Sequence, residues 1–275
     1  MQAICRELRR EGKSIGFVPT MGALHAGHIS LVRAARPRND VVVASIFVNP
    51  LQFGPSEDFS KYPRTLESDS KLLVAEKIDF LFAPSTEEMY PKDASTAVYV
   101  EGLSEKLDGK SRPGHFQGVT TVVNKLFEII RPDRAYFGQK DAAQVAVLKK
   151  MVRDLNIDVE IVVCPIVREA DGLALSSRNV YLTAEQRKQA LVLNRSLMRV
   201  QFLVDRGEFA AAKLAEEAKQ VIAEEPGARL DYFEIVDPDS LDPVLDVSRG
   251  ALVAVAAWVG TTRLIDNIML PPKTR

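Results

Sequence analysis

Short apolar runs alternate with helical patterns through the first 165 residues of the chain. Residues 41–48 are apolar nearly throughout, which is typical of a strand that is covered on both faces. Shorter apolar runs that also predict strands lie at residues 15–18, 78–82, 134–137 and 159–163. Between them, apolar residues recur at helical spacing over residues 119–130 and 145–155. This alternation predicts an α/β fold, a parallel sheet with helices on both sides.

The pattern changes after about residue 165. The string Thr183-Ala184-Glu185-Gln186 fits a capping box and predicts the start of a long helix that ends near Leu203. A second helix is predicted over residues 209–224, and three consecutive strands are predicted at residues 230–236, 251–259 and 263–269. Helices followed by consecutive strands indicate a smaller α+β domain, with a boundary near residues 165–175.

Composition narrows the class of protein. The 275 residues are 46% hydrophobic, which is enough for a sizeable core. Basic and acidic residues number 36 and 37, so the net charge of -1 gives no electrostatic reason to expect a nucleic-acid or membrane partner. Cys5 and Cys164 lie far apart and outside any Cys-x-x-Cys pattern, which argues against a disulfide scaffold and a thiolate metal site.

The first residues and the longest apolar run both favour a cytoplasmic protein. Charged residues interrupt the N-terminus at Arg6 and Glu7, unlike a signal peptide. The longest apolar run, residues 251–260, is about half of a membrane span.

A loop with two histidines follows the first predicted strand. The string Pro19-Thr20-Met21-Gly22-Ala23-Leu24-His25-Ala26-Gly27-His28 opens a predicted helix that runs to about Ala35. A helix N-terminus offers unpaired N–H groups and a positive dipole, which suit a phosphate. His25 and His28 are three residues apart, so both imidazoles can project from one side of the turn and donate hydrogen bonds to phosphate oxygens. The sequence therefore predicts a phosphate site here.

Polar residues follow two further strands of the predicted sheet, where ligands of open α/β sheets bind. Asn49 and Gln52 come after the most buried strand and carry paired donors and acceptors for a polar substrate. Gly138, Gln139, Lys140 and Asp141 follow another strand, with Gln144 one turn later. Lys140 supplies a positive charge, and Asp141 is expected to cap the following helix.

Three other positions are candidates for specific roles. Near the predicted domain boundary, the two hydroxyls and the guanidinium of Leu175-Ser176-Ser177-Arg178-Asn179 can clamp a triphosphate. Asp69, in the helix after Tyr62-Pro63-Arg64, is a candidate contact for magnesium, although a solvated helical carboxylate is favoured. For His115, in Arg112-Pro113-Gly114-His115, a structural role is favoured over a catalytic one.

These strings, in this order and spacing, resemble the pantothenate synthetase (pantoate–β-alanine ligase) family, which belongs to the nucleotidyltransferases with a His-x-Gly-His loop. The resemblance covers essentially the whole chain. It implies a Rossmann-like domain for ATP and pantoate over residues 1–167, a C-terminal α+β lid domain over residues 168–275, and a homodimer. It also implies that (R)-pantoate and ATP form pantoyl adenylate and pyrophosphate, and that β-alanine then releases pantothenate and AMP, with Mg2+ accompanying the nucleotide.

The resemblance also assigns roles to residues. It implies that His28 is the proton or hydrogen-bond donor to phosphate, and that His25, Lys140 and Arg178 share the catalytic work. Gln52 is implied to touch both pantoate and β-alanine, and Gln144 to touch pantoate; Asn49 joins this set. The residues implied to line the ATP site are Met21, Gly22, Ala23, Leu24, His25, Ala26, Gly27, His28, Gly138, Gln139, Lys140, Asp141, Val167, Leu175, Ser176, Ser177 and Arg178.

The chain departs from the family pattern at two of these positions. Gln139 stands where the family often has glutamate, and Ala26 stands where it often has an acidic or longer residue. Neither side chain is expected to act in catalysis. The first predicted strand also lies closer to residue 1 than in many members of the family.

Two other functions remain open on the sequence. The first is an adenylyltransferase that moves AMP onto a phosphate. Its acceptor would need further cationic groups, whereas Asn49, Gln52 and Gln144 suit a small hydroxy acid. The second is an ATP-sensing or tRNA-binding module without catalysis, and the lack of a basic stripe counts against RNA.

Overall fold

The first part of the chain forms a five-stranded parallel sheet. The computed structural model describes residues 1–55 and 57–273. The strands are β1 (Ile15–Thr20), β2 (Val41–Ile46), β3 (Phe80–Phe82), β4 (Arg134–Gly138) and β5 (Glu160–Cys164). They lie in the order β3-β2-β1-β4-β5, and every neighbouring pair is parallel. Each strand lies within or next to a run predicted from the sequence, although β2 ends before Phe47 and β3 begins only at Phe80.

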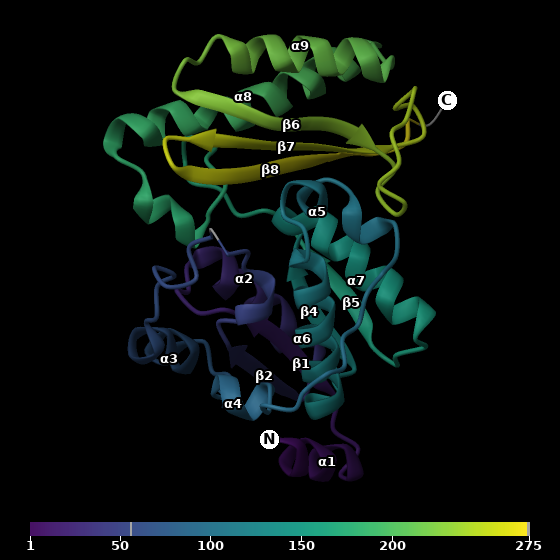
Figure 1. The fold of residues 1–275 in the computed structure, drawn as a ribbon. Helices are drawn as coiled ribbons and strands as arrows, with labels where there is room; N and C mark the ends of the chain where they lie inside the picture. The colour runs from purple at the N-terminus through teal and green to yellow at the C-terminus, as the bar shows by residue number, and fades with distance from the viewer. Residues whose placement is uncertain (56, 274–275) are drawn as a thin grey trace.

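Helices cover both faces of this sheet, as the sequence predicted (Figure 1). Alternate strand residues face opposite sides: Phe17 packs in the core with α6, whereas Val18 packs in a second core with α2. The helices of this part are α1 (Gln2–Arg10), α2 (Ala26–Ala35), α3 (Leu66–Ala75), α4 (Thr86–Met89), α5 (Asp108–Ser111), α6 (His115–Ile130) and α7 (Ala142–Asp154). Single 3-10 turns are η1 (Arg36–Arg38), η2 (Pro50–Gln52), η3 (Leu103–Glu105) and η4 (Gln139–Asp141).

Helix α1 has no counterpart in the sequence analysis. Its apolar residues Ile4, Cys5 and Leu8 recur at helical spacing, although only Cys5 of its nine residues is buried. The helix lies against α6: Cys5 and Leu8 pack in the core to which α6 contributes, and polar residues add further contacts. Arg9 Nη1 donates to the carbonyl of Arg131 at 2.9 Å, and Gln2 Nε2 donates to the carbonyl of Glu128 at 3.5 Å.

The second part is an α+β unit. After the 3-10 turn η5 (Ser177–Tyr181), α8 (Ala184–Asp205) begins at the predicted capping box, in which Thr183 and Gln186 each accept a hydrogen bond from the other's backbone N–H. Then follow α9 (Ala211–Ala223) and an antiparallel sheet of β6 (Ala228–Val236), β7 (Ala251–Val259) and β8 (Thr262–Leu270) in the order β6-β7-β8. In Figure 1, α8 and α9 cover the side of this sheet that faces away from the parallel sheet.

The two parts share apolar packing. One side of β7 packs under α8 and α9 through Val253 and Val255. The alternate residues Leu252 and Ala254 join the core that surrounds Phe17 in the first part. We propose that the boundary between the two domains lies between residues 167 and 168, because a division there leaves each sheet whole. Among the described residues, no helix combines the length and apolar character needed to span a membrane.

Candidate active site

The loop between β1 and α2 is held by a buried carboxylate. Asp69 on α3 is only 2% exposed. Its Oδ2 accepts from the N–H of Ala23 and its Oδ1 from the N–H of Leu24, both at 2.9 Å. The Thr65 hydroxyl adds a third hydrogen bond to Oδ2 at 3.0 Å. Charge-assisted hydrogen bonds of this kind are stronger than neutral ones, so the conformation of the loop is set by α3.

His25 and His28 form a reciprocal cap at the start of α2. The N–H of Gly27 donates to His25 Nδ1 at 3.1 Å, and the N–H of His25 donates to His28 Nδ1 at 3.3 Å. Position 27 must stay small, because a Cβ there would lie 2.8 Å from the His25 ring. A neutral imidazole whose Nδ1 accepts must carry its proton on Nε2. Both rings therefore keep an Nε2–H for a ligand.

Burial keeps the two imidazoles neutral. Desolvation, with a smaller effect from Lys140, lowers the pKa of His25 to about 4. Desolvation, with His25 as the next cause, lowers the pKa of His28 to about 3. Near neutral pH each ring is thus a hydrogen-bond donor and not an imidazolium. For His28, this favours hydrogen-bond donation over proton donation, the two roles that the sequence left open.

Asn49 and Gln52 lie together in the turn after β2. Asn49 is 1% exposed, and its Nδ2 donates to Gln52 Oε1 and to the carbonyl of Gly118, both at 3.0 Å. The hydroxyl of Tyr90 donates to Asn49 Oδ1 at 2.9 Å. Gln52 Nε2 points toward Met21 Sδ, 3.0 Å away. Asn49 thus uses its amide inside the protein, and one effect is to orient the amide of Gln52.

Helix α6 fixes the same turn from the other side. A Cβ on Gly118 would lie 2.3 Å from the carbonyl oxygen of Leu51 and 2.6 Å from the backbone nitrogen of Gln52, so the helix and the turn approach at van der Waals contact. One helical turn earlier, His115 Nδ1 lies 2.8 Å from the Gln52 carbonyl oxygen. Arg112 Nη1 lies 3.0 Å from His115 Nε2.

The tautomer of His115 follows from these partners. Arginine can only donate and a carbonyl can only accept, so Nδ1 carries the proton and Nε2 accepts. Desolvation, followed by the charge of Arg112, lowers the pKa of His115 to about 4. Glu57 holds Arg112 through two contacts of 2.7 and 2.6 Å. These contacts agree with the structural role predicted for His115.

The lowered pKa values of the three partly buried histidines predict a pH-dependent stability. Their folded pKa values lie below the ordinary value of 6.5, so the unfolded chain binds more protons between pH 6.5 and about 4. The contribution of these histidines to the free energy of unfolding is fully present above pH 7. It declines as pH falls below 6.5, by up to about 1.4 kcal/mol per pH unit for each histidine. We expect urea unfolding at pH 7.5 and 5.5 to show this loss, and His115→Asn to reduce it by about a third. A free energy of unfolding that is constant over this range would contradict the prediction.

The third predicted segment lies at the end of β4. The side chain of Lys140 is 20% exposed, and its Nζ lies 3.6 Å from Asp141 Oδ1. The expectation that Asp141 caps α7 is wrong in one respect. The residue occupies the N-cap position, but its side chain makes no capping hydrogen bond, and its carboxylate lies toward Lys140 instead. Gln144 lies in the first turn of α7.

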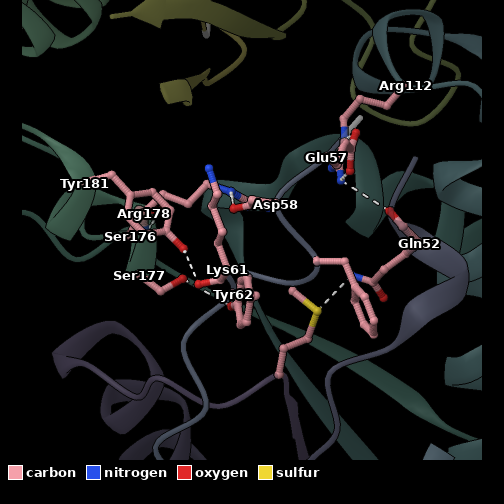
Figure 2. A network of polar contacts seen from close by, with 12 residues as sticks. Gln52, Glu57, Asp58, Lys61, Tyr62, Arg112, Ser176, Ser177, Arg178 and Tyr181 are labelled. Carbon is pink, nitrogen blue, oxygen red and sulfur yellow. Dashed lines mark hydrogen bonds and ion pairs between the residues drawn. The ribbon is translucent and has the colours of Figure 1, made fainter. Parts of the chain in front are cut away.

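The fourth segment is held against a loop of the first part (Figure 2). Arg178 donates from Nε and Nη2 to the two oxygens of Asp58, each at 3.0 Å. The hydroxyls of Ser177 and Tyr62 lie 3.1 Å apart, and the Arg178 guanidinium lies 5.8 Å from the Tyr62 ring centroid. These contacts use Nε and Nη2, and they leave the Nη1 edge of Arg178 to meet a further anion. Just upstream, the N–H of Leu175 donates to the carbonyl of Val167 at 3.0 Å.

Two adjoining cavities bring these segments together. One of about 230 Å³ is lined by His25, His28 and Gln52. The other, about 690 Å³, opens between the two parts of the chain. Residues that line both are Arg112, His115, Lys140, Asp141, Gln144, Ser176 and Arg178.

Not every predicted residue reaches a cavity wall. Those whose side chains or backbone line at least one cavity are Met21, His25, Gly27, His28, Asn49, Gln52, Gly138, Lys140, Asp141, Gln144, Val167, Leu175, Ser176, Ser177 and Arg178. Those that line neither are Gly22, Ala23, Leu24, Ala26, Gln139 and Asp69. Sequence reasoning missed Glu57, Asp58 and Arg112. Single charges in a loop carry no periodic signal, and only their partners in the fold reveal them.

Comparison with known proteins finds similarity over nearly the whole chain. A family model for pantoate-beta-alanine ligase matches residues 1–269. Pantothenate synthetase of Koribacter versatilis is 69% identical over 270 residues, which cover 98% of this chain and 93% of that protein. The crystal structure of pantothenate synthetase from Thermus thermophilus matches with a TM-score of 0.93 and 50% identity over 98% of each chain.

A second solved structure carries ligands. Pantoate-beta-alanine ligase from Francisella tularensis, complexed with beta-gamma ATP and beta-alanine, has a TM-score of 0.78 and is 37% identical. The match covers 98% of this chain and 94% of that one.

Proposed function

The chain belongs to the pantoate–β-alanine ligase family, and from that premise we propose how its two cavities carry out the reaction. The enzyme catalyses the ATP-dependent ligation of pantoate and β-alanine. This activity sets aside the adenylyltransferase and the non-catalytic alternatives. ATP is a substrate, and the finer steps and residue roles below are our proposal.

The proposed reaction has two steps. A carboxylate oxygen of (R)-pantoate attacks the α-phosphorus of ATP and displaces pyrophosphate, which leaves pantoyl adenylate in the site. The amine of β-alanine then attacks the acyl carbon of this mixed anhydride, forms the amide bond of pantothenate, loses a proton and displaces AMP. No covalent bond to the enzyme is needed, so the protein contributes chiefly by positioning and by stabilising charge.

The observation that carries this proposal is the arrangement of donors at the smaller cavity. His25 and His28 each accept a backbone N–H at Nδ1, which leaves two neutral Nε2–H donors at the N-terminus of α2. Lys140 lines the same cavity. Preformed donors are worth most where negative charge builds in the transition state. We propose that His28 donates to the α-phosphate, with His25, Lys140 and Arg178 stabilising the phosphate charges.

The pantoate site is proposed next to these donors. Gln52 is 8% exposed and oriented by Asn49, and Gln144 lines the same cavity from α7. An amide that can donate and accept serves a hydroxyl and a carboxylate together. Gln52 and Gln144 are therefore the proposed pantoate contacts, with Gln52 shared by β-alanine. Asn49 acts chiefly through Gln52.

Magnesium fits this site as a companion of ATP. Among the residues that the structure describes, no group of three or more His, Cys, Asp or Glu side chains could hold a metal ion. Mg2+ is commonly bound by nucleotide phosphates, waters and one or two carboxylates, so no protein cage is required. The ion would neutralise charge on the phosphate oxygens.

Asp69 is the carboxylate proposed to touch this ion. Its oxygens already accept three hydrogen bonds. An ionised carboxylate has about four acceptor sites, so one is unused; because Asp69 is 2% exposed and lines neither cavity, a magnesium-bound water would reach it only if the loop above it moved. We propose that Asp69 first anchors the loop and second makes this contact.

Isotope exchange between pyrophosphate and ATP tests the adenylate route. With pantoate, ATP and Mg2+ but no β-alanine, label from pyrophosphate should enter ATP, because the first step is reversible and its anhydride stays bound. Omitting pantoate is the control and should abolish exchange. Exchange that strictly requires β-alanine would rule out a free-standing adenylation step.

Two further features remain predictions of the family resemblance. A homodimer is expected, and analytical ultracentrifugation of the purified enzyme would test it. A cytoplasmic location is expected as well, and fractionation of cells that express the protein would test that.

A further inference from the structure

Asn267 of β8 connects the second part of the chain to the Lys140 segment. Its side chain is 2% exposed. Its Nδ2 donates to the carbonyl of Gln139 at 3.0 Å and to the carbonyl of Lys140 at 2.9 Å. Its Oδ1 accepts from Gln139 Nε2 at 3.1 Å. One buried amide thus makes three hydrogen bonds to two consecutive residues at the end of β4.

The preceding residue, Asp266, holds the hairpin that precedes the segment from Ser176 to Arg178. It is 3% exposed and accepts from Arg168 Nη1 at 2.6 Å and Nη2 at 2.8 Å. Arg168 Nη1 also donates to the carbonyl of Gly172 at 3.0 Å, and Arg168 forms a β-bridge with Ala174. This hairpin leads directly into the segment from Ser176 to Arg178.

We propose that Asn267 is a positioning residue for ATP, which fixes the backbone of Gln139 and Lys140 so that the Lys140 ammonium faces the phosphates. Asp266 supports the hairpin before Arg178 in the same way. This inference rests on the proposed function, because it takes Lys140 to be a phosphate contact. It makes the C-terminal sheet part of the nucleotide site, although neither residue need touch the nucleotide.

The turn at Lys140 needs such external support. Asp141 gives α7 no side-chain cap, so that source of local order is missing. A lysine has a long and flexible side chain, so the position of its ammonium group depends on how firmly its backbone is held. A displacement of about 1 Å in a catalytic segment can cost about 100-fold in rate. Asn267 supplies this support: it donates to the backbone carbonyls of Gln139 and Lys140 and accepts from the side chain of Gln139.

The first test is the steady-state kinetics of Asn267→Ala with each substrate varied in turn. We expect kcat/KM for ATP to fall by about 30- to 100-fold, while KM for pantoate changes by less than about 2-fold. Met269→Ala is the matched control, because Met269 lies on the same strand and is 43% exposed. An equal rise in KM for ATP and in KM for pantoate would indicate a general structural defect and would overturn the proposal.

A double-mutant cycle with Lys140→Ala tests whether Asn267 acts through Lys140. If it does, Asn267→Ala should cost much less in the Lys140→Ala background than in the wild type. The same fold-loss in both backgrounds would overturn the inference. Lys140→Ala alone tests the underlying function: if that variant used ATP normally, the phosphate role of Lys140 would fail, whatever Asn267 does.

Gln139→Ala keeps the proposal testable if Asn267→Ala does not fold. It removes only the contact between Gln139 Nε2 and Asn267 Oδ1, and leaves both carbonyls bound. A loss of about 3- to 10-fold in kcat/KM for ATP, with pantoate use unchanged, is expected from one neutral hydrogen bond. Unaltered ATP kinetics in a folded Gln139→Ala protein would count against the positioning role.

Discussion

Replacing His28 with alanine should slow formation of pantoyl adenylate by about 100- to 1000-fold, the loss that follows removal of one transition-state donor. The reason is the geometry of the ring. Its Nδ1 accepts the N–H of His25, so its proton lies on Nε2 at the N-terminus of α2. Burial lowers the pKa of His28 to about 3, so the neutral donor form is present throughout the working pH range. Single-turnover measurement of adenylate or pyrophosphate would give the rate directly.

His28→Gln provides the matched comparison. The glutamine amide nitrogen can occupy roughly the position of Nε2, so this variant should recover part of the lost rate. The alanine variant also leaves the N–H of His25 without its acceptor. This should cost about 1 kcal/mol of stability but should not unfold the protein. Wild-type turnover in a folded His28→Ala enzyme would remove His28 from the mechanism.

Gly118→Ala should impair pantoate use strongly. The added Cβ would lie 2.3 Å from the carbonyl oxygen of Leu51 and 2.6 Å from the nitrogen of Gln52, and these backbone atoms cannot rotate away. The turn must therefore separate from α6, and the amide of Gln52 moves with it. We expect kcat/KM for pantoate to fall by about 100-fold. Overpacking should also cost about 1–3 kcal/mol of stability.

Two variants distinguish the causes of this effect. Gln117→Ala changes the neighbouring exposed residue of α6 and should behave as wild type. Gln52→Ala removes the proposed substrate contact itself and should weaken pantoate use by about 1–3 kcal/mol with much less change for ATP. Calorimetric binding of each ligand would show whether Gly118→Ala follows the Gln52 pattern. Equal losses of ATP and pantoate affinity in Gln52→Ala would place Gln52 outside the substrate site.

Much of the fold was predictable because its signals are local. A buried parallel strand such as residues 41–46 is apolar at nearly every position, and a capping box such as Thr183 to Gln186 completes its hydrogen bonds within four residues. Both were read from the sequence. Helix α1 was not predicted, although Ile4, Cys5 and Leu8 recur at helical spacing; the contacts that stabilise it come from the distant helix α6.

By itself, the sequence determined the five strands of the parallel sheet, the helices and strands of the second part, the family and the four segments that surround the cavities. The tertiary structure decided which side chains of those segments are free to meet a ligand and which are used within the protein. Asn49 and Asp69 were predicted to face a substrate and a metal, yet both polar atoms of the Asn49 amide and both oxygens of the Asp69 carboxylate have internal partners. The bonds that fix Lys140 come from Asn267, 127 positions away. Such pairings depend on how the two sheets pack against each other, and this arrangement cannot be predicted from periodicity or local spacing in the sequence.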